Sequence, residues 1–220
     1  MRCFTKQFFN SRQFCGEFYS DQTYEQYIDQ LSRIKSRWYP EKTYQQIFEN
    51  TVIRLFSEDI YHAKEVKELL FDCNGQVKPL DKNIYENMVE FSNIYEKLID
   101  EAFDVVNKAA SQIQQDALSV DVKGLADSWW WHDWIVSSIE SEKRFLVIRF
   151  DFYNIEYRFA LVKGYRYKNL KKYIGGRVLY TELFRNEDYT YEFSILLWDD
   201  GELHEFSIHF HDVEIREAWM

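Results

Sequence analysis

The sequence has little glycine and proline and no long apolar run. It holds 7 glycines and 2 prolines in 220 residues, about a third of the usual share, which excludes collagen-like chains and Gly/Ser linkers. No apolar run approaches the ~20 residues of a membrane helix. The first ten residues lack the apolar stretch of a secretory signal peptide. These absences favour a cytoplasmic protein that does not act at a membrane.

Cysteine is also scarce. The chain has Cys3, Cys15 and Cys73, an odd number whose spacing matches no disulfide or metal framework. We therefore expect reduced thiols, which are typical of a cytoplasmic protein. Neither Cys15 nor Cys73 has a histidine nearby in sequence, which argues against a cysteine nucleophile.

Aromatic residues and acids are abundant. The chain contains 18 Phe, 16 Tyr and 7 Trp, with a net charge of −10. Many large apolar side chains can offset the entropy cost of ordering, so an ordered chain is expected, as one large domain or two small ones. The acidic balance argues against duplex DNA and anionic membranes, which attract clustered Lys and Arg. It permits basic protein partners.

The first half has the periodicity of helices. Apolar residues recur at steps of three and four over 23–38, 41–56, 57–71 and the long range 81–118, which predicts four helices. Thr23 with Gln26 resembles a capping box. The stripe predicted for the first helix ends at Trp38, and the stripe of the second begins at Tyr44. Residues 119–128 are read as the connection to the second half.

The second half has the period of two that is typical of strands. Asp199-Asp200-Gly201 separates two alternating runs and predicts a hairpin. The alternation slips after His211, which predicts a bulge at His211-Asp212. About six strands are expected, mostly in hairpins. The predicted fold class is α+β, with a helical region at 1–120 packed on an antiparallel meander at 121–220.

Three segments resemble an uncharacterised family of bacterial proteins found mainly in Gram-positive species. They are the start Met1-Arg2-Cys3-Phe4-Thr5-Lys6, similar to the family's Met-Arg-Tyr-Phe-Thr-Lys, the step His132-Asp133-Trp134, and the β region that begins at Val178-Leu179-Tyr180-Thr181-Glu182. The resemblance implies a bacterial setting and this architecture, and it implies no activity.

Two features are candidates for a protein-binding surface. Trp129-Trp130-Trp131 is a run of the residue type that most often forms binding hot spots, although such a run also suits a buried junction between the two halves. The second is the acidic turn Asp199-Asp200 with Glu202, for which exposed turn chemistry is the alternative explanation.

A basic stretch interleaved with tyrosines is the alternative site. Clustered cations with aromatic rings are typical of single-stranded nucleic-acid or nucleotide binding, and a solvated hairpin explains the same pattern. The residues concerned are Lys163, Tyr165, Arg166, Tyr167, Lys168, Lys171, Lys172 and Arg177.

Metal and catalytic motifs are weak or missing. His209 and His211 are spaced to share one face of a strand and are weak zinc candidates, whereas the solvated face of an edge strand explains them equally well. No nucleophile elbow, phosphate-binding loop, dinucleotide fingerprint or zinc-protease motif occurs. We therefore expect no cofactor and a non-catalytic protein-binding protein, such as an immunity or anti-defence inhibitor. The oligomeric state stays open.

Overall fold

The computed structural model is an α+β protein, as predicted. It describes residues 1–18, 21–56, 59–127, 132–151, 155–163, 167 and 169–217. Residues that lie close together in space form two compact units. The sheet unit is Met1–Lys6 with Ala102–Met220, and the helical unit is Gln7–Glu101. The long helix α5 (Lys82–Asp116) contributes its first part to the helical unit and its last part to the sheet unit. None of the described helices combines the length and the apolar character needed to cross a membrane.

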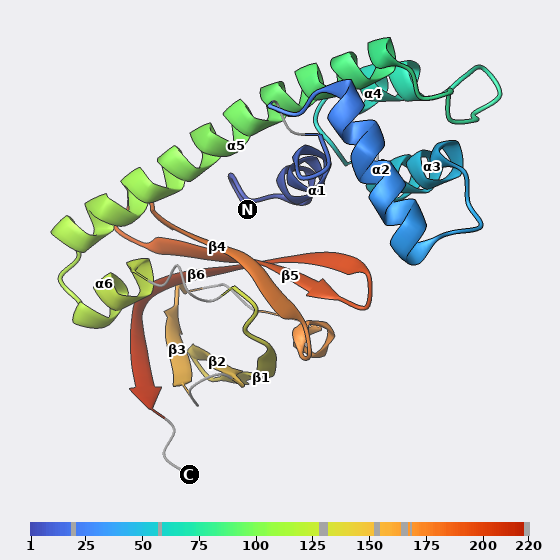
Figure 1. The fold of residues 1–220 in the computed structure, drawn as a ribbon. Helices are drawn as coiled ribbons and strands as arrows, with labels where there is room; N and C mark the ends of the chain where they lie inside the picture. The colour runs from blue at the N-terminus through green and yellow to red at the C-terminus, as the bar shows by residue number, and fades with distance from the viewer. Residues whose placement is uncertain are drawn as a thin grey trace. The chain divides into compact units, whose positions relative to one another are not determined.

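The helical unit contains α2 (Tyr24–Trp38), α3 (Tyr44–Leu55), α4 (Ala63–Leu70), the start of α5 and most of α1 (Lys6–Cys15) (Figure 1). The capping box at Thr23 and Gln26 is confirmed, and α3 begins with a second box at Thr43. The rings of Tyr27 and Tyr85 stack at 5.0 Å. Aromatic rings such as these are among the largest side chains that the unit buries completely.

Several helix boundaries differ from the sequence prediction. Helix α1 was not predicted, and α6 (Val120–Ala126) lies in the range 119–128 that was read as a connection. The helix predicted over 57–71 covers only Ala63–Leu70. The predicted helix 81–118 is confirmed as one continuous element, α5, of 35 residues. The predicted buried stripes are wrong at Trp38 and Tyr44, which are exposed because each lies where its helix meets the α2–α3 turn.

The sheet unit holds six antiparallel strands. They are β1 (Val136–Glu142), β2 (Phe145–Phe150), β3 (Ile155–Leu161), β4 (Arg177–Arg185), β5 (Tyr191–Asp199) and β6 (Glu202–Glu217). Their order is β1-β2-β3-β6-β5-β4, so the prediction of a single meander is wrong. Two three-stranded meanders are joined through β3 and β6, because the chain from 162 to 176 is long enough to carry β4 away from β3.

The sheet curls until its first and last strands meet. Ile135 forms an isolated bridge with Arg177. The Val136 N–H donates to Gly176 O at 3.0 Å, and the Val178 N–H donates to Trp134 O at 2.7 Å. Figure 1 shows these strands curving around the interior of the unit. The curling leaves one apolar interior, filled by residues such as Leu146, Phe159, Phe193, Ile208 and Phe210.

Helix α6 and the predicted bulge complete this interior. Asp121 of α6 accepts a hydrogen bond from the Ile215 N–H at 3.0 Å. Along β6, Phe210 pairs with Leu161 and Asp212 pairs with Ala160, so His211 is the extra residue. The bulge predicted at His211-Asp212 is confirmed. It allows both Phe210 and Val213 to face the interior.

Candidate binding surfaces

The tip of the β5–β6 hairpin presents acids beside a tryptophan. We define the hairpin tip as Trp198, Asp199, Asp200, Gly201 and Glu202. Asp199 pairs with Glu202, and the two residues between them have positive φ values of 43° and 91°. This is the geometry of a two-residue hairpin turn, as predicted from the sequence. Asp200 and Glu202 are exposed, and 40% of Trp198 is accessible.

The carboxylates of the hairpin tip have no strong counter-charge. Within the described part of the chain, no Lys or Arg nitrogen lies within 4 Å of Asp199, Asp200 or Glu202. The nearest basic partner is His204, whose Nε2 lies 3.8 Å from a Glu202 carboxylate oxygen. Unpaired exposed carboxylates attract cations without first having to lose an ion pair.

The other hairpin of this part of the sheet differs from the tip. At the β4–β5 end, Arg2 forms an ion pair with Glu192 at 2.9 Å. The Arg185 guanidinium lies 4.6 Å from the ring centroid of Tyr189. Acids and an exposed ring are therefore present here too, but here an arginine pairs with an acid. At the hairpin tip Arg177 lies 6.0 Å from the Trp198 ring centroid and pairs with Asp133 instead of a tip carboxylate. The hairpin tip alone of these two ends combines a tryptophan with unpaired acids.

The tryptophan run Trp129, Trp130 and Trp131 lies outside the described residues. Its neighbours are described. Trp134 is buried, and its ring meets that of Phe150 edge-on at 5.7 Å. The His132 and Asp133 side chains are 3.0 Å apart between Nδ1 and Oδ2. Both are more than half exposed, so this pair lies at the surface.

The basic stretch turns its described tyrosines inward. Tyr173 is buried against Phe206, with ring centroids 4.6 Å apart. Tyr167 packs edge-on against the same ring at 5.6 Å, and its hydroxyl accepts a hydrogen bond from the His209 N–H at 2.8 Å. These rings are occupied by the protein interior. Stacking on nucleic-acid bases would require free ring faces.

The cations of the same stretch are accessible. Lys163, Lys171 and Lys172 are exposed. Arg177 pairs with Asp133 at 3.6 Å and lies 6.0 Å from the Trp198 ring centroid. Tyr165, Arg166 and Lys168 fall outside the described residues.

The histidines of β6 do not form a recognisable metal centre. Across the described ranges, no three His, Cys, Asp or Glu side chains come together as a group that could hold a metal ion. His209 is partly buried and His211 is the exposed residue of the bulge. His209 and His211 flank the inward-facing Phe210, before the alternation shifts, but the described residues bring no further ligand group to them.

A buried carboxylate, Glu182 of β4, was missed by the sequence analysis. It is 2% exposed. Its oxygens accept hydrogen bonds from the backbone N–H groups of Arg2, of Cys3 at 2.9 Å and of Phe4 at 3.2 Å. The Phe4 ring lies 5.1 Å from that of Tyr180. These contacts attach the N-terminal segment to the outer face of β4, which indicates a structural role for Glu182.

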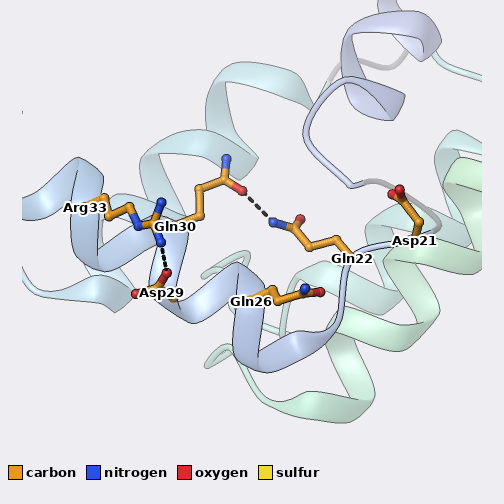
Figure 2. A pocket seen from close by; sticks show the side chains of 6 residues that line it. All are labelled: Asp21, Gln22, Gln26, Asp29, Gln30 and Arg33. Atoms are coloured by element: carbon orange, nitrogen blue, oxygen red, sulfur yellow. Dashed lines mark hydrogen bonds and ion pairs between the residues drawn. The ribbon is translucent and has the colours of Figure 1, made fainter.

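A polar pocket of about 440 Å³ opens in the helical unit (Figure 2). Two internal contacts cross its lining. The Gln22 amide donates to Gln30 Oε1 at 2.7 Å, and Arg33 pairs with Asp29 at 2.6 Å. The described lining contains no histidine, cysteine or hydroxyl nucleophile. Gln22 Oε1 is buried without a hydrogen-bond partner in the described chain. Because Asp29 is paired with Arg33 and no nucleophile of these kinds lines the pocket, it does not point to a reaction.

Comparison with known proteins yields no relative. No protein family, curated protein or solved structure matches the chain. The function must therefore be argued from the surfaces described above.

Proposed function

We propose that this is a non-catalytic, cytoplasmic protein-binding protein that recognises a basic surface of a partner protein through the hairpin tip. The observation that carries the proposal is the exposed Trp198 beside three carboxylates without Lys or Arg partners in the described chain. Tryptophan is enriched among the residues that dominate binding energy. Complementary charge raises the association rate and helps to exclude wrong partners.

An immunity or anti-defence inhibitor is the role that we propose within this class. An acidic surface with a large ring can occupy the basic site of an enzyme that acts on nucleic acid, because it presents the same charge as phosphate. The free thiols Cys3, Cys15 and Cys73 suit a reducing compartment, which supports the cytoplasmic location. The bacterial setting implied by the sequence resemblance is part of the same proposal.

The test is quantitative capture from a bacterial lysate with three immobilised proteins. They are the wild type, Glu202→Lys at the tip and Glu187→Lys on the β4–β5 turn. Both positions are exposed, and both substitutions change the net charge by the same amount. We expect one stoichiometric protein partner that survives nuclease, is lost with Glu202→Lys and is kept with Glu187→Lys. Equal capture by all three proteins would contradict the proposal.

Binding of nucleic acid by the basic stretch stays a prediction, and the same capture experiment tests it through the nucleic acid that is recovered. Recovery of nucleic acid alone, lost on nuclease treatment and on Lys171→Glu/Lys172→Glu, would favour that alternative over protein binding. Turnover of a nucleotide, nucleic acid or ester by the pure protein would contradict the non-catalytic part of the proposal.

A further inference from the structure

The turn between α2 and α3 carries a second, oppositely charged surface. We define the α2–α3 corner as Lys35, Arg37, Trp38, Tyr39, Lys42 and Tyr44. Its three rings are unusually accessible for their size, with exposures of 64% for Trp38, 42% for Tyr39 and 42% for Tyr44. Three large rings within seven residues form an exposed aromatic surface that needs an explanation.

Each ring is accompanied by a cation. The Arg37 guanidinium lies 4.9 Å from the Trp38 ring centroid, and the Lys42 ammonium lies 4.3 Å from that of Tyr39. The Lys35 ammonium lies 5.3 Å from the centroid of Tyr44. Within the described chain, no carboxylate lies within 4 Å of these three cations. The corner is therefore a local positive surface on a chain whose net charge is −10.

The corner is held in shape by local hydrogen bonds. The Tyr39 N–H donates to Lys35 O at the end of α2, and the Lys42 N–H donates to Tyr39 O, both at 3.0 Å. The Ser32 hydroxyl is 3.0 Å from the Tyr44 hydroxyl, which fixes the far side of that ring. Rings and cations that are positioned before binding lose less conformational entropy when a ligand arrives.

We propose that the α2–α3 corner binds single-stranded nucleic acid, with bases on the rings and phosphates on the cations. Alternating cations and exposed rings are the features by which proteins hold single strands. Duplex DNA keeps its bases stacked inside and cannot use the rings. An acidic peptide would pair the cations but would offer few flat groups to the rings. The occupant that uses both halves of the surface is a single strand.

The basic stretch near residue 170 also combines cations with aromatic rings, but the rings of Tyr167 and Tyr173 are packed inward. At the α2–α3 corner the rings face solvent instead. Substitutions at the α2–α3 corner should therefore weaken binding of a single strand, whereas substitutions in the basic stretch should not, and each set is a control for the other.

The test is fluorescence anisotropy with labelled 20-mers of dT and rU at 50 and 200 mM salt. If three cations contact phosphates, the logarithm of the binding constant should fall with the logarithm of the salt concentration with a slope of about −2. Binding should therefore weaken about 20-fold over this range. Lys35→Ala/Arg37→Ala/Lys42→Ala should abolish most of that slope. Trp38→Ala should weaken binding by roughly 5- to 150-fold, which is the loss of one stacked base, and Trp38→Phe should retain most of the affinity. The dT and rU arms distinguish DNA from RNA.

The matched control is Lys171→Ala/Lys172→Ala, which we expect to leave the affinity unchanged. Unfolding midpoints of all variants show that they are folded. The proposal is overturned by an absence of binding at 50 mM salt, by an unchanged affinity for Trp38→Ala, or by a loss that follows Lys171 and Lys172. It is also overturned if polyglutamate or anionic vesicles compete as well as an unlabelled 20-mer, because neither can stack on the rings.

Discussion

The carboxylate of Glu182 accepts a hydrogen bond from the backbone N–H of Cys3 at 2.9 Å, across 179 residues of sequence. Neighbouring contacts support it. The Arg2 guanidinium lies 4.6 Å from the Phe184 ring centroid, and Phe4 packs on Tyr180. The start of the chain and the Leu179–Glu182 region, which both carry the sequence resemblance, are thus physical partners. A change in either segment is expected to affect the other.

Replacing Glu182 should destabilise the sheet unit. In Glu182→Ala, three buried or partly buried backbone N–H groups lose their side-chain acceptor, so we expect the free energy of unfolding to fall by roughly 2–4 kcal/mol. Urea unfolding followed by near-ultraviolet circular dichroism measures the loss. The control is Glu187→Ala, an exposed acid, which should change stability by less than about 0.5 kcal/mol. Equal effects of the two variants would contradict the assigned role.

A side chain at Gly176 is predicted to be destabilising. A Cβ there would lie 3.2 Å from Tyr173 O and 3.3 Å from Leu197 Cβ, where the strand edges of the sheet are joined. Gly176→Ala should cost roughly 1–3 kcal/mol through overpacking. By contrast, a Cβ at Gly124 in α6 meets only Ile215 at 3.6 Å, so Gly124→Ala should stabilise by about 0.5–1 kcal/mol. Thermal unfolding of the two variants should show shifts of opposite sign.

The three thiols should react at very different rates. Burial raises the pKa of Cys15 from 9.0 to about 11, so at pH 8 it has about 100-fold less thiolate than an unperturbed thiol. Burial and the Glu182 charge also raise the pKa of Cys3, whereas Cys73 is exposed. Mass spectrometry after iodoacetamide treatment should find Cys73 modified first and Cys15 last. The difference should vanish in urea, and native Cys15 reacting as fast as Cys73 would contradict the packing of α1.

Glu156 should give the sheet unit a measurable acid sensitivity. Burial acts to raise its pKa, but hydrogen bonds from Arg158 and Arg149 outweigh burial, so the pKa lies below 4.5. A depressed folded-state pKa adds stability above the unfolded pKa, and this contribution is lost as the pH falls through the folded value. We expect the free energy of unfolding of the wild type to exceed that of Glu156→Gln by roughly 1–2 kcal/mol at pH 7. The gap should shrink below pH 4.5, and a gap that stays constant down to pH 3 would contradict this account.

Local signals in the sequence predicted much of the fold. The capping pair Thr23 and Gln26, the turn at Asp200-Gly201 and the slip at His211 each occur where the structure has a helix start, a hairpin and a bulge. These signals act over a few residues, because a cap or a turn satisfies its own hydrogen bonds. The hairpin tip could be located from the sequence because its turn is also a local signal.

Features that depend on distant segments were not predictable in this way. No residue near Glu182 in the sequence indicates that Met1–Lys6 covers its side chain. Tyr167 belongs to the predicted nucleic-acid site, but the fold packs its ring against Phe206. Helix α6 was the exception, since its N-cap Ser119 is a local signal that could have located it.

Site-specific photo-crosslinking tests the central claim most directly. A photoreactive residue is placed at position 200 of the hairpin tip and, as the matched control, at position 187 of the β4–β5 turn, and each protein is irradiated in a nuclease-treated bacterial lysate. The account predicts one discrete protein adduct from position 200, lost in the Trp198→Ala background, and none from position 187. An adduct from position 187 alone, or equal adducts from both positions, would contradict it.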